Sequence, residues 1–181
     1  DLLPLVSWLS TGGRCRYCRR QIGWFEPTIE LGSGLLFVAS YIFWPVELSG
    51  WLSVAQFGLW LIISVMMVIL FAYDAKWFLL PDKIVFPLIA LSVVFAAMTA
   101  ILSGDVSGVL LGALGAIGIL SGIYYALWLI SGGRWIGFGD VKLGIALGLL
   151  LANWQLAFLA LFLANLIGLV VVLPGMITKT L

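Results

Sequence analysis

Long apolar runs, separated by short polar segments, occupy most of the chain from residue 29 onward. Most of them reach the roughly 20 residues that a helix needs to cross a bilayer core of about 30 Å. The run at 141–152 is shorter, which suits a tilted or re-entrant helix, or one that includes its flanking residues. The pattern predicts an all-α fold, a polytopic membrane helical bundle with about six transmembrane helices. The predicted helical segments are 29–46, 51–73, 84–102, 106–131, 141–152 and 155–177.

Residues 1–28 are more polar and carry a cluster of arginines around two cysteines. We expect a small cytoplasmic segment here, followed by a transmembrane domain at 29–181. The first residue, Asp1, is not a translation start, so we expect the chain to be a piece of a longer protein. The arginines of this segment are Arg14, Arg16, Arg19 and Arg20.

The distribution of charge tests the six-segment pattern, because Lys and Arg collect in cytoplasmic loops. With six spans and both ends in the cytoplasm, all 9 basic residues fall on one side of the membrane. The opposite loops hold Glu47, Asp105 and the uncharged stretch around Asn153. A count of five spans would place Lys179 outside. Outside the arginine cluster, the basic residues are Lys76, Lys83, Arg134, Lys142 and Lys179.

The composition agrees with a bilayer protein and excludes several functions. The chain is 64% hydrophobic and 9% charged, whereas soluble domains are roughly half apolar. A formal net charge of +1 neutralises few phosphates, so we expect no nucleic-acid partner. The absence of His excludes Ser-His-Asp and Cys-His catalysis as well as His-ligated metals. Any chemistry must use carboxylates, thiols or amines.

Glycines recur at four-residue spacing along the 106–131 run and just before it. Small residues at this spacing let helix backbones approach closely. We interpret them as a packing face in preference to a substrate groove. These residues are Gly104, Gly108, Gly112, Gly118 and Gly122.

Two aspartates occur where an apolar run meets the basic side of the membrane. Asp74 directly follows the 51–73 run, and Asp140 closes the sequence Gly137-Phe138-Gly139-Asp140 before the next run. Ionisable groups at such positions are expensive and usually functional, so two at one depth suggest a pair. An anion at a helix C-terminus also opposes the helix dipole, so Asp74 needs a reason other than helix stability.

A water-activating dyad supplies that reason. Two aspartates that share a proton give one base to deprotonate water and one acid to polarise an amide carbonyl, without His or metal. The helix-terminus argument favours proton retention on Asp74 and ionisation of Asp140. Gly137 and Gly139 remove side chains beside Asp140, which permits unusual backbone angles and the approach of an extended peptide substrate.

Helix capping is the alternative role for two of the acids. Asp82 precedes a predicted span, and we expect it to be a helix N-cap. Asp140 has the same option, together with an ion pair to Lys142.

Cys15-Arg16-Tyr17-Cys18 has the spacing of half a structural zinc site and of a dithiol redox motif. Zinc takes four ligands, so the remaining ones would come from an upstream segment or another protomer. Unpaired thiols, a structural metal and redox chemistry all stay open, and a cytoplasmic location disfavours a disulfide.

Four motifs, in order, resemble those of the type IV prepilin peptidases, which are polytopic GxGD aspartic proteases. The similar segments are Pro4–Leu9 with Gly13–Cys18, Pro27–Glu30, Tyr73–Asp82 and Gly137–Lys142. The resemblance implies that Asp74 and Asp140 are catalytic and that Asp82 is structural. Family members also have an additional N-terminal helix, an earlier CxxC and a further C-terminal helix.

The resemblance further implies a multi-pass protein of the bacterial inner membrane that removes the leader peptide of prepilins or pseudopilins at the cytoplasmic face. The lipid bilayer is its second partner. Proteolysis would need no cofactor, whereas N-methylation of the new terminus would use S-adenosylmethionine. Two other functions stay open, a membrane thiol oxidoreductase using Cys15 and Cys18 and a small proton-coupled transporter using the intramembrane acids.

Overall fold

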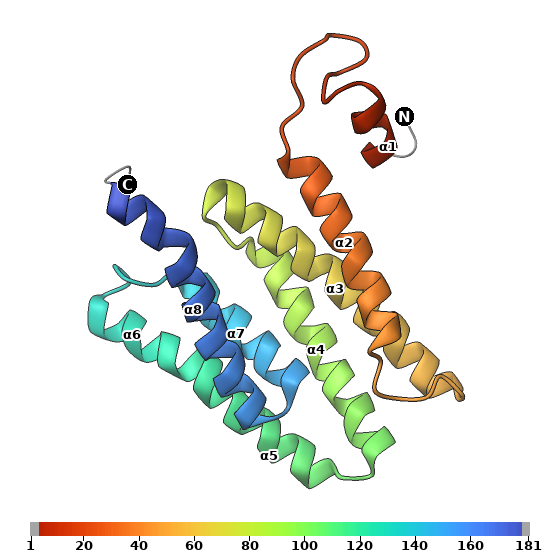
Figure 1. Ribbon diagram of the computed structural model, residues 1–181. Coiled ribbons are helices and arrows are strands. Elements are labelled where there is room, and N and C mark those ends of the chain that lie inside the picture. The colour runs from red at the N-terminus through yellow and green to blue at the C-terminus, as the bar shows by residue number, and fades with distance from the viewer. Residues whose placement is uncertain (1–3, 179–181) are drawn as a thin grey trace. The chain divides into compact units, whose positions relative to one another are not determined.

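The computed structural model describes residues 4–178, and within that range it contains helices and no β-strand (Figure 1). The chain divides into two compact units, Asp1–Phe78 and Leu79–Leu181. The first unit contains α1 (Pro4–Ser10), α2 (Phe25–Ile42) and α3 (Trp51–Trp77). The second contains α4 (Asp82–Ser103), α5 (Val106–Ile117), the π-helix η1 (Gly118–Gly122), α6 (Ile123–Ser131), α7 (Phe138–Leu151) and α8 (Trp154–Thr178).

Every predicted apolar run overlaps helix in the structure, although α2 ends at Ile42, four residues before the end of the 29–46 run. Three of the described helical segments are long and apolar enough to cross a membrane, at Trp51–Trp77, Asp82–Ser103 and Val106–Ser131. These segments confirm the predicted all-α membrane bundle. The helix α7 has 14 residues and a length of about 21 Å, so it is short for a span, and the count of six spans stays a prediction.

The helix α2 starts earlier than the sequence pattern indicates, at Phe25 instead of residue 29. Pro27 lies in its first turn, where a missing backbone N–H costs no helical hydrogen bond. The backbone N–H of Thr28 donates to the carbonyl of Trp24 at 3.0 Å and closes that turn. Pro27 is therefore part of the helix.

The first unit is held by aromatic contacts as well as aliphatic ones. Between α2 and α3, Trp60 Nε1 donates to Ser40 Oγ at 2.8 Å. The ring of Trp44, just after α2, lies 4.9 Å from that of Phe57 on α3. The N-terminal segment folds back on itself through a bridge between Arg14 and Gln21.

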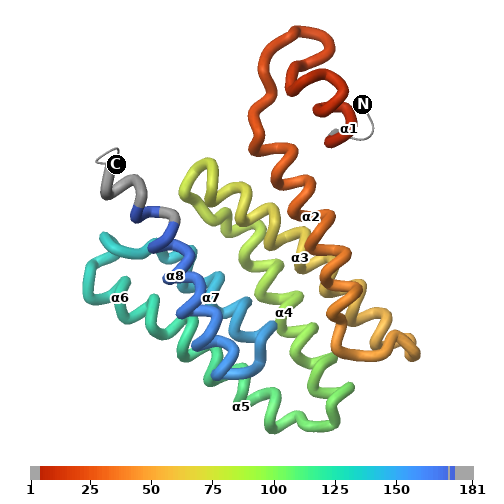
Figure 2. Tube along the Cα trace, viewed as in Figure 1, coloured from red at the N-terminus to blue at the C-terminus, as the bar shows by residue number. Residues whose placement is uncertain are grey.

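The second unit is organised around α7, which contacts α4, α5, η1, α6 and α8. The trace of α5, η1 and α6 runs as one continuous helical rod, as the 106–131 run predicts (Figure 2). Two glycines of α7 bring its backbone against this rod. A Cβ on Gly144 would lie 2.7 Å from the carbonyl oxygen of Leu120, and one on Gly148 would lie 2.7 Å from the backbone nitrogen of Ile117.

The predicted glycine face is confirmed at Gly112 and wrong at the other four positions. A Cβ on Gly112 would collide with the carbonyl oxygen of Ala152, whereas Gly104, Gly118 and Gly122 have nothing within 4 Å and Gly108 meets its own cap, Asp105. Positions 112 and 118 are six residues apart, or about 600° of rotation, so they lie on different sides of the helix. The π-turn of η1 changes the register again before residue 122.

These contacts make a stability prediction. Gly144→Ala places a methyl group against rigid backbone, which typically costs about 1–3 kcal/mol. We expect the thermal unfolding midpoint in detergent to fall by several degrees. Gly122→Ala is the matched control, because its site is open and Ala is the better helix former by about 1 kcal/mol. An unchanged midpoint in Gly144→Ala would show that the two backbones are not in contact.

Candidate active site

Asp74 lies in the last turn of α3, which extends one turn beyond the predicted end of the apolar run. Its carbonyl oxygen accepts a hydrogen bond of 2.8 Å from the backbone N–H of Phe78, the left-handed residue that ends the helix at φ 52°. The side chain of Asp74 is exposed. Asp74 thus lies at the C-terminal end of the helix, which is the negative end of the helix dipole.

Asp140 lies at the opposite kind of helix end. It is in the first turn of α7, after Gly137 at the N-cap, and it is partly buried. Its backbone N–H donates to the carbonyl of Gly137 at 3.2 Å. Free N–H groups and the positive dipole end favour an anion here. The structure therefore places Asp74 at a helix C-terminus and Asp140 at a helix N-terminus, as the sequence predicts.

The two motif glycines have different neighbours. A Cβ on Gly137 would lie 3.5 Å from Asp140 Oδ2, so this glycine borders the carboxylate directly, whereas one on Gly139 would lie 3.0 Å from Leu80 Cβ. The expectation of unusual backbone angles is wrong at Gly137, because φ −72° and ψ 144° suit any residue. Gly139 is likewise not among the positive-φ glycines of the described chain. A role of either glycine in substrate binding stays a prediction.

Asp82 is not the N-cap of its helix. Pro81 occupies that position without a side-chain cap bond, and Asp82 is the first residue of α4. Its carboxylate instead pairs with the ammonium of Lys142 on α7. Lys142 Nζ also lies 5.3 Å from the ring centroid of Phe86 and 5.6 Å from that of Phe138. The lysine that the sequence offered to Asp140 thus binds a residue 60 positions away.

A similar ion pair joins two helices of the first unit. Lys76 Nζ lies 2.8 Å from Glu26 Oε1 and 4.4 Å from the ring centroid of Phe25. Glu26 is in the first turn of α2 and Lys76 in the last turn of α3. Sequence reasoning missed both pairs, because neither lysine is close to its partner along the chain.

The candidate catalytic aspartates belong to different units, Asp74 to the first and Asp140 to the second. Each is at the helix end that the sequence predicts for it. The convergence of their carboxylates stays a prediction.

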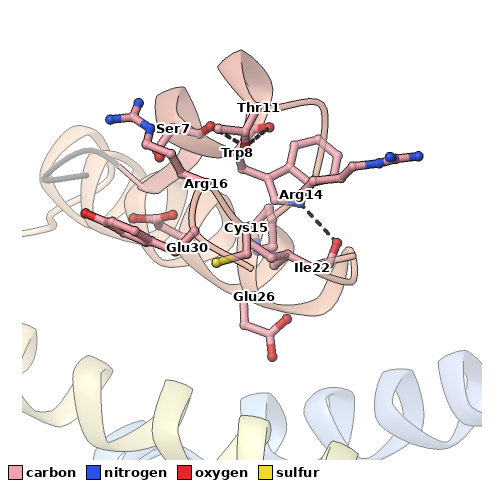
Figure 3. Close-up of a pocket in the computed structure, with 11 residues that line it drawn as sticks. Ser7, Trp8, Thr11, Arg14, Cys15, Arg16, Ile22, Glu26 and Glu30 are labelled. Carbon is pink, nitrogen blue, oxygen red and sulfur yellow. Dashed lines mark hydrogen bonds between the residues drawn. The ribbon is translucent and has the colours of Figure 1, made fainter. Parts of the chain in front are cut away.

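The two cysteines lie in the N-terminal segment, which contains a cavity of about 220 Å³ (Figure 3). Cys15 lines it, and the guanidinium groups of Arg14 and Arg16 extend away from Cys15 on opposite sides. Neither cysteine is in a disulfide. Hydrogen bonds from the backbone N–H groups of Cys18 and Tyr17, followed by the Cys18 thiol, lower the pKa of Cys15.

The residues around this cavity do not complete a zinc site. Among residues 4–178, no group of three or more His, Cys, Asp or Glu side chains is arranged to hold a metal. Cys15 and Cys18 supply two of the four ligands of tetrahedral zinc. Zinc binding stays a prediction that requires two more ligands.

The sequence matches the models of two protein families. The model of the type IV leader peptidase family matches residues 61–173, a range that contains both Asp74 and Asp140. The chain belongs to the type IV leader peptidase family. The model of the bacterial peptidase A24 N-terminal domain matches residues 1–44, which include both cysteines.

Curated relatives of this leader peptidase family member are named prepilin leader peptidase/N-methyltransferase. The one from Aeromonas hydrophila is 34% identical over 167 residues, covering 92% of this chain and 54% of the relative. The one from Pseudomonas aeruginosa is 32% identical over 172 residues, covering 92% and 54%. The one from Klebsiella pneumoniae is 36% identical over 169 residues, covering 91% and 68%. The chain thus spans about half the length of several of these relatives, and no solved structure matches it.

The hydrogen bonds to Cys15 make a reactivity prediction for this leader peptidase family member. A lowered pKa puts more thiolate at neutral pH, so the rate of Cys15 alkylation by iodoacetamide should have its midpoint below the ordinary thiol value of about 8.5. Trypsin cleaves after Arg16, so mass spectrometry follows the two cysteines on separate peptides. Cys18→Ala should raise the midpoint only in part, since the backbone donors remain. A midpoint at or above the ordinary value in the folded protein would contradict the described loop.

The ion pair in the first unit makes a titration prediction. The hydrogen bond from Lys76 and, next, the Glu26 backbone N–H lower the pKa of Glu26. The pair therefore stabilises the fold above the ordinary Glu pKa of about 4.3, and that contribution is lost as pH falls through the lowered value. Carboxyl carbon NMR should show Glu26 titrating below the ordinary value. Lys76→Met should raise its pKa, and Lys83→Met, the control, should not. If Lys76→Met leaves the pKa of Glu26 unchanged, the ion pair between Lys76 and Glu26 is contradicted.

Proposed function

We propose that this protein is a membrane aspartic endopeptidase that removes the leader peptide of type IV prepilins or pseudopilins at the cytoplasmic face of the bacterial inner membrane. The observation that carries the proposal is the family match over residues 61–173. The placement of Asp74 and Asp140 at helix ends supports it, because those ends lie on the basic side of the predicted topology.

The helix termini assign different roles to the two aspartates. Asp140, at the positive end of α7, is the ionised base that takes a proton from the attacking water. Asp74, at the negative end of α3, stays protonated and donates a hydrogen bond to the scissile carbonyl oxygen. When the tetrahedral intermediate collapses, the proton on Asp140 passes to the leaving amine. Proton transfer between the two carboxyl groups and water requires no cofactor.

The proposed topology has six spans with both termini in the cytoplasm. It places the basic residues of the described chain on the cytoplasmic side, and Lys179 lies outside the described residues. Residues 1–28 are then a cytoplasmic segment and residues 29–181 the transmembrane protease domain.

A second activity follows from the names of the relatives, which include N-methyltransferase. We propose methylation of the new pilin N-terminus with S-adenosylmethionine as the methyl donor. The alternative functions, a thiol oxidoreductase and a proton-coupled transporter, have no support in the matched families.

Substitution of each aspartate tests the proposal. Asp74→Asn and Asp140→Asn remove the titratable groups with little change of shape, and we expect each to lower the cleavage rate of a leader-bearing prepilin at least about 100-fold. The readout is the shift of the pilin band on a gel after incubation with purified protein in detergent.

Asp105→Asn is the matched control. Asp105 caps α5 by accepting a hydrogen bond of 2.8 Å from the Gly108 backbone N–H, and Asn caps helices equally well. This variant should cleave normally. Full cleavage by Asp74→Asn or Asp140→Asn would end the dyad assignment.

A further inference from the structure

Each candidate catalytic aspartate is followed two residues later by a lysine that binds another helix. Lys76 follows Asp74, and Lys142 follows Asp140. In each unit the lysine pairs with an acid in the first turn of a neighbouring helix. The two pairs are Lys76 with Glu26 of α2 and Lys142 with Asp82 of α4.

Helix geometry makes this spacing informative. Successive residues of an α-helix are rotated by about 100°, so residues two apart point about 200° away from each other. A lysine at this position binds a neighbour behind the helix, and the aspartate is presented on the opposite side. An acid three or four residues away would instead share the face of the lysine.

The contact is best developed at Lys142. The side chain of Lys142 is 14% exposed, whereas that of Asp82 is 56% exposed. The ammonium lies within cation–π range of two rings, those of Phe86 on α4 and Phe138 on α7. Asp82 is at the N-terminus of α4, where the dipole favours its negative charge. The ammonium therefore has a fixed position between the two helices.

A second contact holds the same turn of α7. A Cβ on Gly139 would lie 3.0 Å from Leu80 Cβ, so the residue preceding Asp140 is already at packing distance from the segment that leads into α4. The backbone on both sides of Asp140 is thus held against α4, by Gly139 on one side and by Lys142 on the other. A tilt of this turn would move the carboxylate.

The pair in the first unit is more exposed, with side-chain exposures of 38% for Lys76 and 58% for Glu26. Ion pairs between exposed side chains add little to the stability of a protein, because water and salt screen them. Its contribution to stability is therefore small. Lys76 nevertheless joins the last turn of α3, which carries Asp74, to the first turn of α2.

We propose that Lys76 and Lys142 are positioning residues, each of which ties the helical turn bearing a catalytic aspartate to the start of a neighbouring helix. The inference rests on the proposed endopeptidase function. Neither lysine touches the substrate in this scheme, and each acts through the aspartate two residues before it. A lysine that only stabilised the charge of the aspartate would need no partner acid, whereas this role requires the acid at the start of the neighbouring helix.

Steady-state cleavage of a prepilin by the purified protein in detergent tests the proposal. A displacement of about 1 Å at a catalytic group costs up to about 100-fold in rate, so we expect Lys142→Met to lower kcat 10- to 100-fold while KM changes less than threefold. Asp82→Asn should have the same effect, because it breaks the pair from the other side with little change of shape. Lys142→Arg should retain most of the activity.

The exchange Asp82→Lys with Lys142→Asp should recover a large part of the kcat lost by Lys142→Met. The equivalent set in the first unit is Lys76→Met, Glu26→Gln and the exchange Glu26→Lys with Lys76→Glu. Lys83→Met is the matched control, since Lys83 is an exposed lysine of the same first turn as Asp82. It should leave kcat and KM unchanged.

Three results would overturn the proposal. These are wild-type kcat in the Met variants, a raised KM with kcat unchanged, and equal loss in the Met and Arg variants at an unchanged unfolding midpoint. If a Met variant fails to fold, the isosteric Asp82→Asn and Glu26→Gln decide, and wild-type kcat in them counts against the proposal. Full activity in Asp140→Asn is a separate result. It would contradict the proposed catalytic dyad, independently of the role of the two lysines.

Discussion

The backbone of α7 lies directly against the backbones of α5 and η1, and the position of Asp140 depends on this contact. Glycine at 144 and 148 leaves no side chain between the helices, and Ser121 Oγ donates to the carbonyl of Val141 at 2.9 Å one turn closer to the candidate site. The helix α7 has only 14 residues, so its position within the second unit is set by the helices around it. Asp140 lies at the N-terminus of this closely packed helix.

The two candidate catalytic carboxylates lie at opposite kinds of helix end. One is in the first turn of α7 and the other in the last turn of α3. The proposed mechanism uses this difference, so that a chain without His takes its acid and its base from one residue type. The lysine that follows each aspartate adds a mechanical constraint, because it fastens the back of the same turn to a neighbouring helix.

Sequence reasoning predicted the features that depend on local pattern. Hydropathy located the helices from residue 29 onward but not the short α1, and the motif spacing located both aspartates at helix ends. Sequence reasoning failed for contacts between residues that are far apart along the chain. Asp82 reads as a cap, yet Pro81 occupies the cap and Asp82 binds Lys142, a partner that only the packing of α4 on α7 selects. The prediction of one glycine face ignored both the 3.6-residue period of the helix and the π-turn. It therefore identified the close contact at Gly112 but missed those at Gly144 and Gly148.

The central claim is that Asp74 and Asp140 meet in one site. It is tested most directly by cross-linking Asp74→Cys with Asp140→Cys in a chain that also carries Cys15→Ser and Cys18→Ser, using dibromobimane, a short reagent that fluoresces once both of its ends have reacted. The account predicts strong fluorescence for this pair and none for Asp105→Cys with Asp140→Cys, which the topology places at opposite membrane faces. No fluorescence from the first pair, while both thiols still react with a monofunctional maleimide, would contradict it.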